Sequence, residues 1–416
     1  MEFTQGVRFD SLGLTEEVQR ALKKKNIEES TPVQAGCIPP MREWKDVIAK
    51  APTGTGKTFA FGIPIIEHIE PGSEETEAVI LAPTRELAMQ ITAELRDLCV
   101  YLPGVRIVCL YGGAPIGKQI DALKKHPQIV VATPGRLSDH MKRRTVKLDN
   151  VKTVVLDEAD RMLDMGFWPT MKKIVAATPS SRQTLLFSAT LDRKVMQSVS
   201  AILRDPTFVE VAHKGETSDT IEQFIVPVGS MQKASLLRLL LAERGSKRVI
   251  VFTDTKTRAE ICTGQLKRAG FRAESIHSDK TQAQRKRALA AFSKGDVDVL
   301  VATDVLARGI DVPDIAYVVN YELPENPDDY VHRIGRTGRA GEAGCSISFV
   351  SPEAKAQLLD IEKLLGSKIP TLAVEGYDAT EAERALANRF VSKTTRGSAA
   401  FSRSLRRNPT GFGRRR

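Results

Sequence analysis

Short runs of apolar, β-branched residues alternate with longer stretches of helical periodicity along most of this chain. Each short run ends in a cluster of Pro, Gly, Ser, Thr or Asp residues, which is typical of parallel strands joined by crossover helices. The first series of such runs lies at 46–50, 78–82, 106–110, 128–132, 153–156 and 184–187. Because these runs are apolar almost throughout, we expect helices to cover both faces of the sheet that they form.

A second series of short apolar runs follows the polar segment 212–220. It lies at 248–252, 273–277, 297–302, 316–320 and 345–350. The strand pattern stops beyond Gly366, and only 380–390 then shows the periodicity of a helix. The pattern predicts an α/β fold with two parallel sheets, one for each series.

The length of the chain agrees with two domains, because 416 residues exceed what one hydrophobic core usually organises. We expect domains at 1–211 and 221–370, a linker at 212–220 and a C-terminal extension at 371–416 with a disordered end. The sequence shows no signal-peptide pattern and no run of about eighteen apolar residues. We therefore expect a cytoplasmic protein.

The net charge of +10 is unevenly distributed along the chain. Residues 391–416 hold eight Lys or Arg residues and no carboxylate, so the first 390 residues carry a net charge near +2. This tail also contains Phe401 and Phe412, and it could tether a nucleic acid or act only as a solubilising end. The five cysteines form no CxxC or Cys/His cluster, which argues against a disulfide framework and against a zinc site.

A candidate phosphate-binding loop, Ala51-Pro-Thr-Gly-Thr-Gly-Lys-Thr58, follows the first expected strand and precedes a helix. In such a loop the backbone N–H groups surround phosphates, and the helix N-terminus favours an anion. We expect Lys57 to reach the β- and γ-phosphates of ATP and Thr58 to reach a magnesium ion. Position 51 is Ala where the simplest form of this pattern has Gly.

Charged residues elsewhere complete the chemistry of phosphoryl transfer. Asp157 and Glu158 end an expected strand, where one carboxylate can hold Mg2+ and the other can orient a water molecule. Taken alone, the two could equally be a solvated strand end. The segment 332–339 presents three arginines, and an arginine aimed at the γ-phosphate stabilises the transition state. Because these arginines belong to the second domain, we expect ATP to bring the two domains together.

Nine motifs in order resemble those of the DEAD-box RNA helicases, over about residues 9 to 350. They are at 30–34, 51–58, 83–87, 112–113, 133–136, 157–160, 188–190, 302–311 and 332–339. The resemblance implies two tandem RecA-like domains. Ile27, Ser30 and Pro52 depart from the usual pattern, where Phe, Pro and Gln are common, so the affinity for adenine can differ.

The same resemblance assigns roles to residues around ATP. Adenine would be recognised by Phe9 and Gln34. The phosphates and Mg2+ would be held by Thr53, Gly54, Thr55, Gly56, Lys57, Thr58 and Asp157. Glu158 would position the attacking water, and Arg336 and Arg339 would be the arginine fingers. Gly309 and Asp311 would lie near the nucleotide, and hydrolysis would be coupled to strand separation through Ser188, Thr190 and His332.

The resemblance also implies an RNA backbone path across both domains. Its residues would be Arg85, Gly113, Thr133, Arg136, Arg285 and Thr303. Small residues admit phosphates close to the main chain, and Arg and Thr donate to phosphate oxygens. Each Gly or Thr taken alone could equally serve turn geometry. Contacts of this kind carry no base information, so we expect binding that is independent of RNA sequence.

The sequence thus predicts an ATP-dependent RNA helicase whose hydrolysis of ATP is stimulated by RNA. It would unwind short RNA duplexes or remodel ribonucleoprotein complexes. An alternative is an ATP-locked RNA clamp or assembly scaffold with slow hydrolysis. A DNA helicase would share the fold and the ATP chemistry, and only the family resemblance favours RNA.

Overall fold

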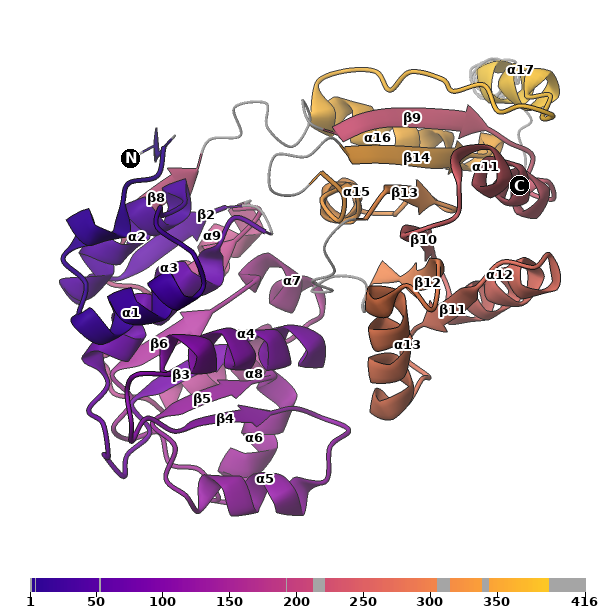
Figure 1. Ribbon diagram of the computed structural model, residues 1–416. Coiled ribbons are helices and arrows are strands. Elements are labelled where there is room, and N and C mark those ends of the chain that lie inside the picture. The colour runs from indigo at the N-terminus through magenta and orange to yellow at the C-terminus, as the bar shows by residue number, and fades with distance from the viewer. Residues whose placement is uncertain are drawn as a thin grey trace, which may run out of the picture.

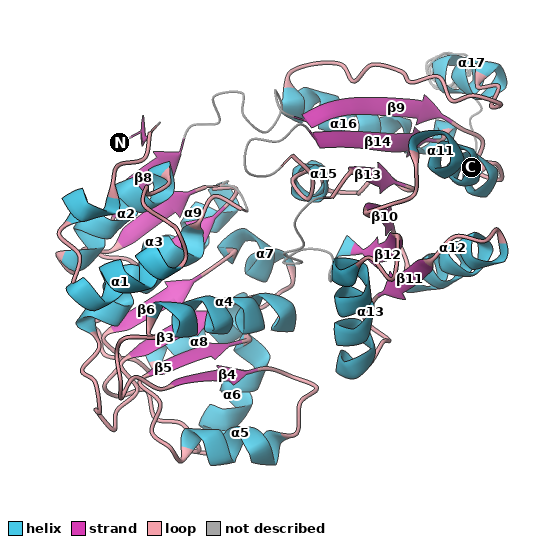
Figure 2. Cartoon of the chain, in the orientation of Figure 1, coloured by secondary structure: helices cyan, strands magenta, loops and turns pink. Residues whose placement is uncertain are grey.

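The structure of the chain is a computed structural model that describes residues 2–3, 5–51, 54–191, 193–211, 221–304, 315–338 and 344–388. It consists of two lobes, each built on one parallel sheet (Figure 1). Figure 2 shows helices on both faces of the strands in each lobe. The predicted α/β fold class is therefore confirmed. The expected linker and the basic tail from 391 onward lie outside the described residues.

The first sheet has eight parallel strands in the order β1-β8-β2-β7-β6-β3-β5-β4. These strands are β1 Glu2–Phe3, β2 Val47–Lys50, β3 Ala78–Leu81, β4 Ile107–Leu110, β5 Ile129–Ala132, β6 Thr153–Leu156, β7 Gln183–Ser188 and β8 Thr207–Val211. The helices around them are η1 Phe9–Leu12, α1 Glu16–Lys24, α2 Pro32–Arg42, α3 Lys57–His68, α4 Arg85–Leu98, α5 Ile116–Leu123, α6 Pro134–Lys142, α7 Ala159–Asp164, α8 Trp168–Ala176, α9 Arg193–Val199 and η2 Ser200–Ile202.

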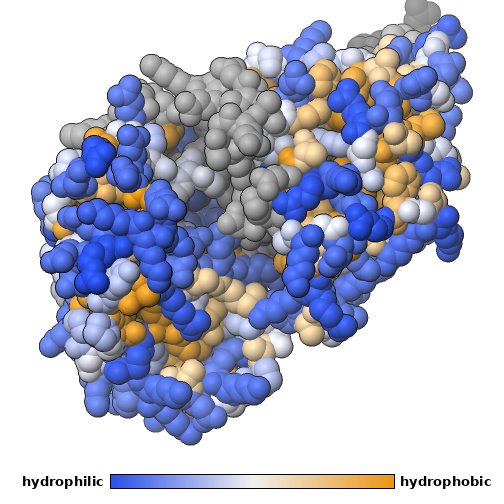
Figure 3. All heavy atoms as spheres, in the orientation of Figure 1, coloured by the Kyte–Doolittle hydropathy of each residue, from blue (hydrophilic) through white to orange (hydrophobic). Residues whose placement is uncertain are grey.

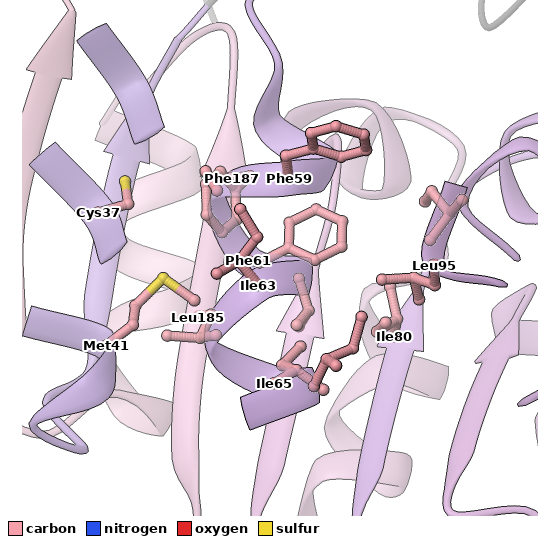
Figure 4. Close-up of a cluster of buried hydrophobic side chains, with 14 of the residues drawn as sticks. Cys37, Met41, Phe59, Phe61, Ile63, Ile65, Ile80, Leu95, Leu185 and Phe187 are labelled. Carbon is pink, nitrogen blue, oxygen red and sulfur yellow. The ribbon is translucent and has the colours of Figure 1, made fainter. Parts of the chain in front are cut away.

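Each face of the first sheet has its own hydrophobic core, because successive strand residues point to opposite faces. On β3, Ala78 and Ile80 join one cluster, whereas Val79 and Leu81 join the other. Figure 4 shows part of the first cluster, where the rings of Phe61 and Phe187 meet edge to face with centroids 5.2 Å apart. Helices on both faces are therefore anchored to the same strands.

The second sheet has six parallel strands in the order β11-β12-β10-β13-β14-β9. The strands are β9 Ile221–Pro227, β10 Val249–Thr253, β11 Ala273–Ile276, β12 Val299–Thr303, β13 Tyr317–Asn320 and β14 Gly344–Val350. The helices are α11 Lys233–Arg244, α12 Lys256–Arg268, α13 Gln282–Lys294, α15 Pro327–Ile334, η3 Pro352–Ala354, α16 Lys355–Leu365 and α17 Thr380–Asn388. Alternation along β10 again divides its residues, since Val249 and Val251 face one cluster and Ile250 and Phe252 the other.

All eleven strands expected from the apolar runs are present, with ends that differ by at most two residues. The sequence pattern missed β8 and β9, and also the two-residue β1. β9 is an edge strand with polar residues at Glu222 and Gln223, yet it pairs with β14 along its whole length. An edge strand needs fewer apolar residues than a central one, which is why the pattern did not reveal it.

The surface on the side shown in Figure 3 is mostly hydrophilic over both lobes, with smaller apolar patches between. Within the described residues, no helix is long and apolar enough to cross a membrane.

We predict that Phe61→Ala lowers the free energy of unfolding by about 3–5 kcal/mol, because it leaves a cavity beside Phe187. Urea-induced unfolding of the full chain would measure the change. Met231→Ala is the matched control: its side chain is 96% exposed, so it should shift stability by no more than about 0.5 kcal/mol. Equal effects of the two substitutions would contradict the packing described here.

Candidate functional site

The phosphate loop leads into α3 through Gly56, which has a φ of 85° and occupies the N-cap position. A Cβ atom at this residue would overlap with Nε2 of Gln34. That Nε2 donates to the carbonyl oxygen of Gly56 at 2.9 Å, and Oε1 of Gln34 accepts from the Thr31 N–H at 2.9 Å. Gln34 therefore ties the segment before α2 to the loop.

Lys57 is the first residue of α3, and its side chain is buried within the loop. Its Nζ donates to the carbonyl oxygen of Ala51 at 3.2 Å, across the turn that the loop makes. Thr55 and Thr58 are half-buried nearby, and Gly54 has a φ of 87°. Thr53, also expected to contact phosphate, lies outside the described residues.

Asp157 and Glu158 follow β6 and are both buried. Burial raises the pKa of the Asp157 carboxyl to about 7, although Lys57 opposes this rise. Burial would also raise the pKa of Glu158, but nearby cations outweigh it, Arg161 and Lys57 foremost, and hold that pKa at about 2. Glu158 has a left-handed backbone with a φ of 50°, and its Oε2 lies 3.1 Å from Nη1 of Arg161.

The second domain brings further positive charge to Glu158. His332 and Arg336 both lower the pKa of this carboxyl, so the end of α15 lies close to the end of β6. Arg336 is buried, and its Nε donates to the carbonyl oxygen of His332 at 3.2 Å. The structure thus brings Lys57, Glu158 and Arg336 together from two domains. Arg339, Gly309 and Asp311 lie outside the described residues.

Asp160 links the two motifs that follow β6 and β7, a role that the sequence did not suggest. Its Oδ2 accepts from the N–H groups of Ala189 and Thr190, at 3.1 and 2.9 Å, and from Thr190 Oγ1 at 3.0 Å. The Oγ of Ser188 in turn donates to the carbonyl oxygen of Thr190 at 2.6 Å. Ser188 and Thr190 are therefore connected by hydrogen bonds to the segment that directly follows Glu158.

Arg333 is a structural residue, in contrast to Arg336. It is 1% exposed, and its Nε and Nη2 reach the two carboxylate oxygens of Asp304 at 2.5 and 2.7 Å. Its guanidinium also lies 5.1 Å from the ring centroid of Phe252. The spacing of the arginines in 332–339 did not distinguish this anchoring role from a catalytic one.

Phe9, expected to recognise adenine, lies in η1 and is 3% exposed, within the hydrophobic core of the first domain. Ser30 fixes the chain just before it: its Oγ donates to the carbonyl oxygen of Val7 at 2.8 Å and accepts from the Val7 N–H at 2.9 Å. A role for Phe9 in adenine recognition stays a prediction.

A cavity of about 550 Å³ is lined by four of the six residues of the expected RNA path. Its walls include Arg85, Gly112, Thr133 and Arg136 of the first domain and Arg285 of the second. Burial and the neighbouring guanidiniums of Arg285 and Arg136 lower the pKa of Arg85, so three positive charges converge here. Thr303, at the end of β12, is not part of the cavity wall.

Two arginines of this cavity are positioned by the loop after β4. Gly113 has a φ of 87°, and a Cβ atom there would overlap with the guanidinium of Arg85. Nη1 of Arg136 donates to Gln119 Oε1 and to the carbonyl oxygen of Ala114, both at 3.1 Å. Gln119 was missed by sequence reasoning, since an isolated amide in a helix gives no signal.

Arg285 and Glu86 form an ion pair between the domains. Nη1 of Arg285 lies 3.0 Å from Oε1 of Glu86, and the side chains are only 5% and 6% exposed. Arg285 also donates to the carbonyl oxygens of Lys280 and Ser278, both at 3.2 Å. Oε2 of Glu86 is buried without a hydrogen-bond partner among the described residues. The residue expected to bind RNA therefore also joins the two domains.

Comparison with known proteins gives this site a family. A family profile described as DEAD/DEAH box helicase matches residues 31–199, and one described as helicase conserved C-terminal domain matches residues 232–341. The ATP-dependent RNA helicase CshA of Listeria monocytogenes is 45% identical over 371 residues, covering 89% of this chain and 71% of the relative. The chain belongs to the DEAD-box helicase family. The DEAD-box ATP-dependent RNA helicase CshA of Bacillus subtilis is 44% identical over 389 residues, covering 91% and 78%.

Solved structures of DEAD-box helicases share the fold. S. cerevisiae Dbp5 bound to RNA and ADP BeF3 has a TM-score of 0.81 and 30% identity, covering 91% of this chain and 99% of that chain. Mss116p bound to ssRNA and AMP-PNP has a TM-score of 0.80 and 30% identity, covering 97% and 88%. These matches confirm the expected pair of RecA-like domains. A Dbp5 variant bound to Nup159, Gle1, IP6 and ADP has a TM-score of 0.62 and 28% identity, covering 92% of this chain and 100% of that chain.

We predict that Glu86→Gln shifts this DEAD-box protein toward separated domains. The substitution leaves the guanidinium of Arg285 buried without its counter-charge, which typically costs about 3–5 kcal/mol unless the domains part and water solvates it. Small-angle X-ray scattering should show a larger radius of gyration.

The matched control is Asp97→Asn in the same helix. It removes the same charge from an exposed ion pair with Lys25, which lies within the first domain, so the radius of gyration should stay unchanged. An unaltered radius in Glu86→Gln would exclude a role for the buried ion pair in domain contact.

Proposed function

We propose that the protein is an RNA-stimulated ATPase that unwinds short RNA duplexes or remodels ribonucleoprotein complexes. One observation carries this proposal: Glu158 lies among cations of both domains, and both domains also line a cavity that holds three arginines. An active site divided in this way works only when the domains meet. The family relatives, named ATP-dependent RNA helicases, support the same function.

Lys57 and the backbone of the phosphate loop would bind the β- and γ-phosphates of ATP. Asp157 and Thr58 would hold a magnesium ion that accompanies the nucleotide, because a bound cation would offset the burial that raises the pKa of the Asp157 carboxyl to about 7. The ion would supply charge neutralisation at the phosphates.

Glu158 would orient the attacking water. Because its pKa is about 2, the carboxylate stays ionised and accepts a hydrogen bond from water, but it is a weak base. Its role is therefore to aim the water at the γ-phosphate. Arg336, and Arg339 by family resemblance, would stabilise the negative charge that develops during transfer.

Arg85, Arg136 and Arg285 would bind the phosphates of single-stranded RNA in the shared cavity. The pair between Arg285 and Glu86 forms where the domains meet, so closure around ATP and completion of the RNA path occur together. Hydrolysis and phosphate release would then let the domains separate. We place this activity in the cytoplasm, in agreement with five cysteines that form no disulfide.

We predict that Gly56→Ala weakens ATP binding more than Gly54→Ala does, by about tenfold or more. Both substitutions strain a positive φ, but only a methyl group at Gly56 displaces Gln34 and leaves buried polar groups unpaired, at about 1–3 kcal/mol each. Titration with a fluorescent ATP analogue would measure both affinities. Equal losses would mean that the contact between Gln34 and Gly56 has no part in nucleotide binding.

We further predict that single-stranded RNA accelerates ATP hydrolysis and that Glu158→Gln abolishes this activity while ATP still binds. The amide keeps the shape of the side chain but loses the negative charge that orients water. The assay compares hydrolysis without nucleic acid, with RNA and with the matching DNA.

These three arms, together with a measurement of how much RNA stays bound in the presence of ATP, separate the candidate functions. Stimulation by RNA alone agrees with the proposal. Equal stimulation by DNA would show that the path ignores the 2′-hydroxyl group. RNA retained on the protein with ATP but with negligible turnover would overturn the proposal in favour of an ATP-locked clamp.

A further inference from the structure

A second cavity, of about 530 Å³, lies between α4, β4 and α5 of the first domain and α13 of the second. Figure 1 shows α13 extending toward the β4–α5 side of the first domain. The cavity is lined by Met89, Thr92, Arg96, Val108, Cys109, Tyr111, Ala114, Pro115, Lys118, Gln119, Ala122 and Lys286. Three of these residues are cations and none is a carboxylate.

The three cations, Arg96, Lys118 and Lys286, form no ion pair within the described part of the chain. Nη2 of Arg96 donates to the carbonyl oxygen of Ile107 at 3.1 Å, a contact that leaves its charge uncompensated. Lys124 at the end of α5, in contrast, lies 3.1 Å from Asp121. Unpaired cations around a hollow favour an anionic ligand.

The charges of two of these cations converge on one strand from different domains. Burial raises the pKa of the Cys109 thiol, whereas Arg96 and Lys286 both oppose that rise. The two cations therefore lie near the same edge strand, although they are 190 positions apart in the chain. A ligand between them would contact both domains at once.

This cavity shares its wall with the RNA path proposed above. Tyr111 lines the second cavity, and its neighbour Gly112 lines the first. Likewise, Lys286 lines the second cavity, and its neighbour Arg285 lines the first. Gln119 joins the two, because it lines the second cavity and bonds Arg136 of the first. A strand leaving the first cavity over this wall would pass from the arginines of the first cavity to Arg96, Lys118 and Lys286 of the second.

The remaining lining residues suit the bases of such a strand. Tyr111 is half-buried and offers an aromatic face, and Met89 and Pro115 add apolar surface. Bases that are not paired stack on aromatic side chains whatever their identity, while cations follow the phosphates.

We propose that this second cavity binds a further stretch of single-stranded RNA, whose phosphates are bound by Arg96, Lys118 and Lys286. The proposal rests on the RNA-binding function proposed above. Since the site is complete only when the two domains meet, RNA long enough to enter it would hold the closed arrangement more firmly than short RNA does.

The test measures the affinity of the full chain for single-stranded RNA of about 4 to about 16 nucleotides, with a non-hydrolysable ATP analogue and at several salt concentrations. The variant replaces Arg96, Lys118 and Lys286 with Ala. Its control replaces Lys124, Arg268 and Lys294 with Ala, which removes the same charge from exposed positions outside both cavities.

In the wild type and in the control, we expect affinity to rise with length until the second cavity is filled. In the variant, the affinity should stop rising at a shorter RNA length. Its affinity for long RNA near 0.1 M salt should be up to about 100-fold weaker, and the slope of log affinity against log salt concentration should be smaller by about 2. The shortest RNA that binds should be bound equally by all three proteins.

Three outcomes would overturn the inference: no gain with length in the wild type, a gain that survives in the variant, or an equal loss for short and long RNA. If affinity still rises with RNA length in the variant, the ligand expected for the cavity becomes an acidic protein segment instead. Failure of the wild type to bind RNA of any length would refute the proposed function itself, which is a different result. As a check that does not depend on variants, a 4-thiouridine beyond the shortest binding length should cross-link to peptides within 89–122.

Discussion

Parallel pairing of every strand is the constraint on which this molecule depends. Because all strands of a sheet run in one direction, their carboxyl ends meet at a single edge, and the loops that follow them face the same space. The phosphate loop, Asp157 and Thr133 follow such ends in the first domain, and Ser188 is the last residue of β7. The second sheet places Thr303 and Tyr321 in equivalent positions. Two edges facing each other form a site that neither domain contains alone.

Charged groups from both domains meet in that space. The acidic groups, Asp157 and Glu158, come from the first domain, while His332 and Arg336 come from the second. In the cavity proposed to bind RNA, both domains contribute arginines, and Glu86 balances one of them. In both places, charged groups of the two domains meet in one interdomain space.

Much of this arrangement could be predicted from the sequence, because local patterns encode it. Apolar runs predicted eleven strands, and Lys57 or Asp157 can be located from the strand that precedes each. Contacts between distant side chains could not be predicted in this way. The pair between Glu86 and Arg285 joins residues 199 positions apart, and the anchoring of Arg333 by Asp304 depends on how α15 packs.

The edge strand β9 illustrates a second limit, since its polar residues give no apolar run although β14 pairs with it fully. Gln119 is a third case, because a buried amide becomes meaningful only when Arg136, Tyr111 and His140 are seen around it.

The interdomain ion pair has a consequence for how the molecule cycles. Two charges that leave water on contact lose most of the Coulombic gain to desolvation, and the unpartnered oxygen of Glu86 reduces that gain further. An apolar contact of the same size would hold the domains together by default. A buried charge pair instead aligns the two domains in one register while contributing little net free energy to their contact. The free energy needed to open the domains therefore stays small, and bound ligands would set the lifetime of the closed form.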